Sequence, residues 1–278
     1  MRNYKERINR ASDALKNAEC ILIGAGAGLS DAAGLKYSGK RFTDRFGDFI
    51  RKYDMKDLYT SSFYPFETME KKWAYWARHI SLNRFETPAT ELYNKLYQLV
   101  KGKKHFVLTT NVEHQFWKAG FSDEKIFAAQ GEYGYIQCAV GCHAKLYDNE
   151  RLVSDMLKQT KDCKIPSELV PKCPVCGGEM DVNIRKDEYF VQDEAWYNAS
   201  ENYNAFLDEI LGKRVVFIEL GVGFNTPGII RYPFERMTYK NPNAIIIRLN
   251  RDYLDGLVEN KDKTITFNED MMGVISSL

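Results

Sequence analysis

The chain has 278 residues, of which 44% are hydrophobic and 28% are charged, a composition typical of a globular protein with a sizeable core. Its 39 Lys and Arg nearly balance its 38 Asp and Glu, so the net charge is +1. No basic block is dense enough for a nucleic-acid binder, and we expect no nucleic acid as a partner. No apolar run is long enough to span a bilayer, and we expect no membrane contact.

The first 20 residues are polar and amphipathic. Tyr4, Ile8, Ala11 and Leu15 fall on one face of a predicted helix, and the segment lacks the apolar stretch of a signal peptide. We therefore expect a cytoplasmic protein. The six cysteines would be thiols in that compartment. Because four of them form two close pairs, a metal site is a better interpretation than disulfides.

Short apolar runs alternate with helical patterns along the chain, which is typical of a parallel sheet covered by helices. Each run ends in Gly, Asn or Thr, as strands do at the ligand-binding edge of a doubly wound sheet. The predicted strands are 20–23, 105–108, 125–128, 215–220 and 244–249, and the predicted helices are 67–82, 89–99 and 196–211. The predicted fold class is α/β, with a Rossmann-type doubly wound parallel sheet.

Two segments interrupt this alternation. Residues 38–65 are rich in aromatic and basic side chains without a clear period, and form either a mobile lid over a cofactor or an ordinary surface excursion. Residues 132–181 hold the paired cysteines among turn-forming residues. Within one unit, 1–278, we expect a larger domain from 1–37, 85–131 and 183–278, and a smaller domain from the insertions 38–84 and 132–182.

The segment ILIGAGAGLS is an apolar strand followed by a glycine-rich turn and the start of a helix. Gly24, Gly26 and Gly28 would permit close approach of the backbone to a pyrophosphate. A plain tight connection is the alternative. The acidic residue that holds a ribose hydroxyl in ordinary dehydrogenases, about twenty positions further on, is missing from a strand end.

Polar residues follow three other predicted strands. In LTTNVEHQF, Asn111 offers a donor and acceptors that could hold a ribose or a water, or it could simply cap a helix. LGVGFNTPG and the Asn250 that ends IIIRLN place small and amide residues where a nucleotide could contact them.

The paired cysteines have the spacing of a zinc site. Cys138 and Cys142 lie in CAVGC, and Cys173 and Cys176 lie in CPVCGG. Four thiolates can close a tetrahedral zinc site, which would be structural because it leaves no open coordination position. His143 is a possible substitute ligand, and four reduced cysteines without metal are the alternative.

Taken in order, these segments resemble the sirtuin family of NAD-dependent enzymes, over about residues 18–250. GAGLSDAAGL resembles the family's Gly-Ala-Gly-Ile-Ser turn, TTNVE its Thr-Gln-Asn-Ile-Asp segment, GVG its Gly-Thr-Ser, and Asn250 an adenosine-side asparagine. The resemblance implies NAD and Zn²⁺ as cofactors. The NAD contacts that it implies are Gly26, Ala27, Gly28, Ser30, Gly34, Thr110, Asn111, Gln130, Gly221, Val222, Gly223 and Asn250.

Two departures from the family lie near the reacting ribose. Gln130-Gly131 stands where deacylating sirtuins carry His-Gly, and KYSG, residues 36–39, stands in place of a Pro-x-Phe-Arg segment. This pattern resembles a bacterial branch linked to macrodomain proteins, class M, whose members are associated with protein ADP-ribosylation. The resemblance implies two partners, a lipoyl-carrier acceptor similar to the glycine-cleavage H protein and an operon-linked macrodomain protein.

The glutamine decides which reaction we expect. Opening of the bond to nicotinamide needs positioning and electrostatics, whereas deacylation also needs a base with a pKa near neutrality. The amide of Gln130 can orient a ribose but cannot accept its proton. We therefore predict an NAD-dependent protein ADP-ribosyltransferase with Asn111 and Gln130 as its catalytic residues. His114 or Glu132 acting as a displaced base is the alternative that would restore deacylation.

Other interpretations remain open at this stage. The chain could be a deacylase for an unusual acyl group, a non-catalytic NAD-binding regulator or, least favoured, a dehydrogenase. Residues 185–198 lie where sirtuins pair the substrate peptide as an extra strand, although a charged connector is equally consistent with their composition. Arg41, Arg45 and Arg185 could receive an acidic carrier domain.

Overall fold

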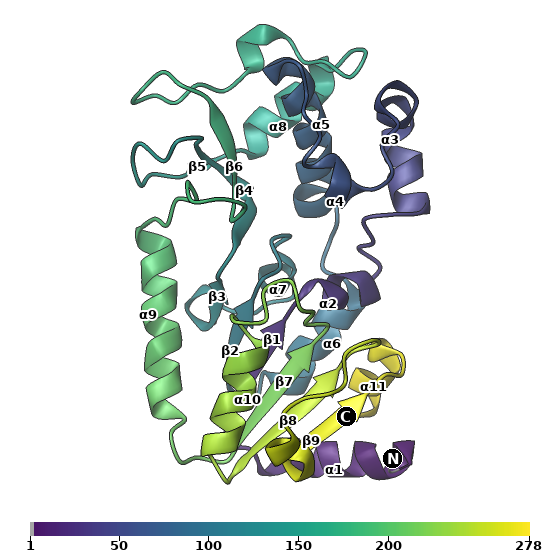
Figure 1. The fold of residues 1–278 in the computed structure, drawn as a ribbon, viewed down its shortest axis with the longest axis vertical. Helices are drawn as coiled ribbons and strands as arrows, with labels where there is room; N and C mark the ends of the chain where they lie inside the picture. The colour runs from purple at the N-terminus through teal and green to yellow at the C-terminus, as the bar shows by residue number, and fades with distance from the viewer. Residues whose placement is uncertain (1–2) are drawn as a thin grey trace.

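A computed structural model describes residues 3–278, which contain a six-stranded sheet and a three-stranded sheet (Figure 1). The larger sheet has the order β3-β2-β1-β7-β8-β9, and every neighbouring pair is parallel. Its strands are β1 (Cys20–Ala25), β2 (Lys104–Thr109), β3 (Ile126–Ala128), β7 (Val215–Leu220), β8 (Ala244–Leu249) and β9 (Thr264–Phe267). The predicted doubly wound parallel sheet is confirmed.

Helices cover both faces of this sheet, which is why its strands are apolar along their whole length. All six residues of β1 and of β7 are buried. One face packs against α1 (Tyr4–Asn17), α2 (Ala27–Ala32), α6 (Glu91–Val100), α7 (Gln115–Lys118) and α11 (Met271–Ser277). The other face packs against α9 (Glu194–Glu209) and α10 (Arg231–Lys240), which stand side by side in Figure 1.

The five predicted strands and three predicted helices are all present, with ends within two residues of the expected ones. The sequence analysis missed α10, β9 and α11. Strand β9 has only four residues, which is too short for a periodicity to stand out. Helix α10 contains Pro233, which usually signals a break but is tolerated within the first helical turn.

The smaller sheet is antiparallel, with the order β5-β4-β6, and lies beyond the end of the larger sheet (Figure 1). Its strands are β4 (Gly131–Cys138), β5 (Tyr147–Asp148) and β6 (Met180–Ile184), and its helices are α3 (Lys40–Tyr53), α4 (Leu58–Ser61), α5 (Met69–Ile80) and α8 (Glu150–Gln159). A π-turn, Ser81–Phe85, extends α5, and short 3₁₀ turns lie at Asp123–Lys125, Ser167–Leu169 and Val258–Lys263. We propose that the smaller sheet, its four helices and the turns at Ser81–Phe85 and Ser167–Leu169 form the smaller domain expected from the two insertions.

Most of residues 38–65 lie in α3 and α4, so the expectation of a segment without a clear period was wrong. Phe42, Phe46 and Phe49 are buried in the core of the smaller sheet and its helices. Their spacings of four and three residues match one face of a helix. Basic and acidic residues between them hid this period, and helix α3 is itself distorted at Phe46, whose φ is −123°.

His79 lies at the centre of this aromatic core. Its side chain is fully buried, Nδ1 lies 3.1 Å from the Tyr75 hydroxyl, and the Trp76 and Tyr133 rings pack against it. Burial, reinforced by the positive charge of Arg41, lowers the pKa of His79 to about 3. The folded protein therefore holds this imidazole in its neutral form.

Acid should destabilise the fold through His79. In the unfolded chain His79 binds a proton below a pKa of about 6.5, whereas in the folded chain it does so only near 3. The free energy of unfolding therefore has its full value above pH 6.5 and decreases as the pH falls. We expect His79→Phe to remove a slope of up to about 1.4 kcal/mol per pH unit between pH 6 and 4. Urea unfolding at several pH values measures this slope, and parallel curves for the two proteins would contradict the prediction.

Candidate functional site

The glycine and amide segments singled out from the sequence lie along one edge of the larger sheet. Ala128, Thr109, Ala25, Leu220 and Leu249 form one row of paired residues across β3, β2, β1, β7 and β8. One or two positions beyond that row come Gln130, Asn111, Gly26, Gly221 and Asn250. Because the strands are parallel, this is their carboxyl edge, where doubly wound sheets bind ligands.

Two glycine turns pack backbone against backbone at this edge. A Cβ on Gly28 would lie 2.7 Å from the Gly221 Cα, and a Cβ on Gly26 would lie 2.8 Å from the Gly221 carbonyl oxygen. Gly221 has a φ of +59°, and a Cβ on it would lie 2.3 Å from the Gly28 carbonyl carbon. The glycines were expected to let the backbone approach a pyrophosphate. In the structure they let the turn after β1 approach the turn after β7. Gly24 instead admits Ile230 and Phe234 of the α10 region.

A buried polar cluster joins the first glycine turn to the segment after β2. Ser30 Oγ donates to Glu113 Oε1 at 2.7 Å, and the Tyr93 hydroxyl donates to the same oxygen at 2.9 Å. Asn111 Nδ2 donates to the Gly26 carbonyl at 3.0 Å and lies 3.2 Å from the Tyr93 hydroxyl. Burial and the nearby Glu113 charge raise the pKa of Tyr93 well above its usual value, so this hydroxyl stays protonated.

These contacts fix which atom of Asn111 can meet a ligand. Both protons of its amide nitrogen have protein partners, whereas Oδ1 accepts no hydrogen bond from residues 3–278. Glu113 and Tyr93 were not among the predicted site residues. Glu113 could have been found because it lies in the TTNVE segment. Tyr93 could not, because a tyrosine on the apolar face of α6 resembles any other core residue.

The remaining predicted contacts lie on the same turns. The amide of Thr110 donates to the Ala25 carbonyl at 3.0 Å, and Gly34, with a φ of +84°, follows the end of α2. Asn250 Nδ2 donates to the Val222 carbonyl at 2.8 Å, which ties the turn after β8 to the turn after β7. Ala27 begins α2, and a Cβ on Gly223 would lie 4.0 Å from the Tyr253 ring. Their roles as NAD contacts remain predictions.

Gln130 lies in the turn between β3 and β4, and its neighbour fixes that turn. Gly131 has a φ of +85°, and a Cβ there would lie 2.2 Å from the Asn183 carbonyl oxygen, so only glycine fits. The Gln130 carbonyl accepts a bond from the Arg185 amide at 3.0 Å. The side-chain amide of this half-buried residue makes no hydrogen bond within residues 3–278 and is free to meet a ligand.

His114 and Glu132, the two candidate displaced bases, are bound to each other. His114 Nδ1 lies 2.9 Å from Glu132 Oε2, Arg84 Nε bonds the other oxygen, and the imidazole stacks on Trp117 with 4.4 Å between ring centres. Burial would raise the pKa of Glu132, but the His114 bond and the Arg84 charge outweigh it and hold the pKa below its usual value. Glu132 is therefore a paired anion.

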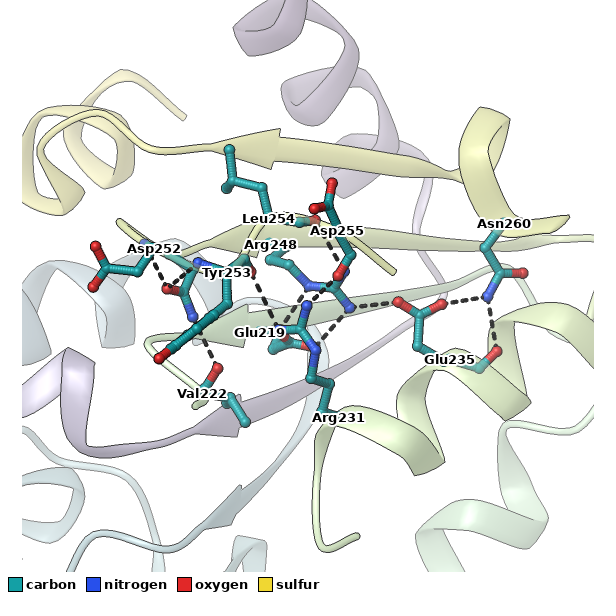
Figure 2. Close-up of polar contacts among 11 residues, drawn as sticks. Glu219, Val222, Arg231, Glu235, Arg248, Asp252, Tyr253, Leu254, Asp255 and Asn260 are labelled. Carbon is teal, nitrogen blue, oxygen red and sulfur yellow. Dashed lines mark hydrogen bonds and ion pairs between the residues drawn. The ribbon is translucent and has the colours of Figure 1, made fainter. Parts of the chain in front are cut away.

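Charged residues that the sequence analysis missed lie beneath the turn after β8 (Figure 2). Glu219 of β7 and Arg248 of β8 are register partners inside two apolar strands, and both are fully buried. Arg231, Glu235 and Asn260 complete the cluster. One acidic and one basic residue in neighbouring apolar strands, VVFIEL and AIIIRL, is a signal that could have revealed the pair.

The four predicted metal ligands come together at one end of the smaller sheet. Cys138 Sγ lies 3.7 Å from Cys176 Sγ, and Cys142 Sγ lies 3.6 Å from Cys173 Sγ. Two sulfurs bound to one tetrahedral zinc at about 2.3 Å would be about 3.8 Å apart, so the thiols fit Zn²⁺. His143 is close as well, with Nδ1 3.1 Å from Cys142 Sγ and Nε2 3.0 Å from the Tyr147 hydroxyl.

The fold and this edge define a nucleotide-binding protein with a structural metal module. The chain is 37% identical over 265 residues to a protein ADP-ribosyltransferase of Staphylococcus aureus, covering 95% of this chain and 84% of that protein. It is also 31% identical over 251 residues to a probable bifunctional ADP-ribose hydrolase/ADP-ribosyltransferase of Fusarium oxysporum f. sp. cubense. That match covers 86% of this chain and 41% of the Fusarium protein. No family model matches the chain.

Solved sirtuin structures share the fold. A Sir2 enzyme studied for its mechanism and regulation aligns over 98% of both chains with a TM-score of 0.59 and 15% identity. A Sir2 complex with a p53 peptide and NAD+ aligns over 97% of this chain and 95% of that one, with a TM-score of 0.54 and 16% identity. At these identities the likeness concerns the fold alone.

The chain therefore belongs to the protein ADP-ribosyltransferase family and has the sirtuin fold. This confirms the predicted sirtuin fold and the predicted class of enzyme, an NAD-dependent ADP-ribosyltransferase, whereas the link to macrodomain proteins stays a prediction. Across residues 3–278, the helices are all too short or too polar to cross a membrane.

Removal of the metal should loosen the smaller sheet. A structural zinc site adds to folding free energy, so chelation should expose the four ligand thiols and lower Tm by more than about 2 °C, the shift that 1 kcal/mol gives at this size. Thiol titration, zinc analysis and thermal unfolding measure these changes. Cys176→Ser should reproduce them, and Cys20→Ala, far from the cluster, should keep its zinc. A purified parent without zinc and with a stable fold would contradict the assignment.

Proposed function

We propose that this enzyme opens the bond between nicotinamide and ribose in NAD and transfers ADP-ribose to an acceptor protein. Membership of the ADP-ribosyltransferase family supports the transfer. The single observation that carries the proposal is the Gln130 side-chain amide, which has no partner among residues 3–278. It lies in the turn beside the Asn111 segment, where deacylating sirtuins have a histidine.

The edge offers a contact for each part of the dinucleotide. The turns at Gly26 and Gly221 present main chain to the diphosphate, since neither turn carries a side chain at its closest point. Asn111 Oδ1 and the Gln130 amide serve the ribose next to nicotinamide, and Asn250 serves the adenosine side. The complexes of other Sir2 proteins with NAD+ and with ADP-ribose support a dinucleotide site on this fold.

NAD supplies the ADP-ribosyl group, and nicotinamide leaves with the electron pair of the broken glycosidic bond. Asn111 and Gln130 orient the ribose so that an acceptor heteroatom can form the new bond at C1′. The acceptor loses its proton to water or to a neighbouring base of its own. Gln130 cannot take that proton because an amide has no pKa near neutrality.

Deacylation would need a base that this site does not present. General-base help is worth about 10²- to 10⁴-fold in rate. Glu132 is engaged by Arg84 and His114, and His114 is held by Glu132 and Trp117. These contacts support a structural role for His114 and favour transfer over deacylation.

We propose a lipoylated carrier protein, similar to the glycine-cleavage H protein, as the acceptor, and a macrodomain protein as a functional partner. The Fusarium relative, whose name joins an ADP-ribose hydrolase to an ADP-ribosyltransferase in one longer chain, is consistent with a partner that reverses the modification.

Of the three arginines considered for docking the carrier, Arg41 bonds Asn83 and the Leu82 carbonyl, and Arg45 pairs with Glu86. Arg185 is exposed, and its guanidinium carbon lies 4.8 Å from the centre of the Phe190 ring.

The proposal is tested by intact-mass measurement of lipoylated and unlipoylated carrier after incubation with enzyme and NAD. We expect a mass increase of one ADP-ribose on the carrier, and no deacetylated peptide formed in step with NAD consumption when an acetylated peptide is supplied. Gln130→Ala should slow transfer about 10²- to 10³-fold, the cost of removing one oriented polar group from a reacting centre.

His114→Asn is the matched control for that variant. Asparagine tolerates the left-handed backbone at this position, where φ is +66°, and can still donate to Glu132. We expect its transfer rate to stay within about threefold of the parent. Robust NAD-coupled deacetylation by the parent, abolished by His114→Asn, would overturn the proposal in favour of the displaced base.

A further inference from the structure

Two buried arginines hold the loop that follows β8. Figure 2 shows the Arg231 and Arg248 side chains reaching from α10 and β8 toward the main chain of residues 253–255. Arg231 Nη1 donates to the Tyr253 carbonyl at 3.2 Å, and its Nη2 bonds the Asp255 carbonyl. Arg248 Nη1 donates to the Leu254 carbonyl at 3.2 Å and to the Asp255 carbonyl at 3.0 Å.

Buried carboxylates balance both guanidinium groups. Glu219 accepts from Arg231 Nη1 at 3.1 Å and from Arg248 Nε and Nη2 at 2.8 and 3.0 Å. Glu235 accepts from Arg248 Nη2 at 2.6 Å and from Asn260 Nδ2 at 2.6 Å. Buried ion networks of this kind are costly to desolvate, and apolar residues in their place often stabilise a fold equally well. What apolar residues could not supply is the set of hydrogen bonds by which this network fixes the loop after β8.

The held loop carries residues of the candidate nucleotide edge. Asn250 Oδ1 accepts the amides of Asp252 and Tyr253 at 3.1 and 3.0 Å, while its Nδ2 bonds Val222 in the turn after β7. A Cβ on Gly256 would lie 2.0 Å from Glu235 Oε1 and 2.6 Å from Arg248 Nη1. The loop can settle onto the ion network only because residue 256 has no side chain.

Arg231 also contacts the second loop of that edge. Its guanidinium carbon lies 4.7 Å from the centre of the Phe224 ring, and Phe224 meets Tyr253 edge to face at 5.1 Å. Phe224 and Tyr253 are 50% and 46% exposed. One arginine thus links the loops after β7 and after β8, both of which present a half-exposed aromatic ring next to Asn250.

We propose that Arg231 is a positioning residue for the adenosine half of NAD, acting through the Tyr253 and Phe224 loops and held in place by Glu219. This inference rests on the proposed function, because it assumes that the edge binds NAD. Arg231 does not touch the reacting ribose. Its loss should weaken dinucleotide binding while leaving the chemical step intact.

The test compares Arg231→Lys with Arg78→Lys. Arg78 is a matched control because it too pairs with a carboxylate, Asp48, donates to a main-chain carbonyl and lies over a phenylalanine ring, but in the helices of the smaller sheet. Lysine keeps the charge in both variants and loses the fork of donors that reaches several acceptors. We expect Arg231→Lys to raise the KM for NAD and the Kd for ADP-ribose by the same factor, about tenfold, with kcat within twofold, and Arg78→Lys to change none of them.

Two further results keep the test decisive if Arg231→Lys folds poorly. Phe224→Ala removes only a half-exposed ring, and Gly256→Ala pushes the loop from the network, so both should raise the Kd for ADP-ribose. A parent that binds neither NAD nor ADP-ribose would refute the proposed function. A parent that binds both, with unchanged Kd in Arg231→Lys, Phe224→Ala and Gly256→Ala, would refute the positioning role alone.

Discussion

The contact between the glycine turns after β1 and β7 is the constraint on which the rest of the site depends. A methyl group at Gly26, Gly28 or Gly221 would meet main-chain atoms, which cannot rotate away as a side chain can. Side-chain-free turns can therefore meet at the centre of the carboxyl edge, where the two halves of a doubly wound sheet join. The Gly26 carbonyl, once fixed, holds Asn111, and the turn after Gly221 holds Asn250.

Two kinds of polar network extend outward from this contact. On one side the Ser30 and Tyr93 hydroxyls both bond Glu113 Oε1, and the Tyr93 hydroxyl also accepts from Asn111 and so orients it. On the other side a charge-balanced cluster holds the loop after β8. Neither network depends on a ligand for its hydrogen bonds, so the edge is organised before a dinucleotide arrives, which lowers the ordering cost of binding.

The sequence predicted the central sheet well because continuous apolar runs and strand-end residues are local signals. Asn111, Gln130 and Asn250 were placed at one edge from that pattern, and the register places them there. Tyr93, Arg231 and Glu235 lie on helices, and their site roles arise from pairings with Glu113, Glu219 and Arg248, which are 20, 12 and 13 positions away. Such pairings depend on the tertiary fold, so no local pattern carries them. Helix α3 was missed for a different reason, since charged residues stand between the three phenylalanines of its apolar face.

The two ends of the edge differ in how firmly their side chains are held. The loop near Asn250 is fixed by two arginines with main-chain acceptors, whereas the Gln130 amide has no partner within residues 3–278 and only the turn that carries it is pinned, through Gly131 and Arg185. Strong binding at the end remote from the chemistry can be used to orient the reacting end. A transferase whose acceptor is another macromolecule must leave its reacting carbon accessible to a nucleophile that arrives from outside. A firmly held loop on the proposed adenosine side and an uncommitted amide on the proposed ribose side would meet both requirements. An imidazole poised to deprotonate the ribose would instead favour the intramolecular step of deacylation.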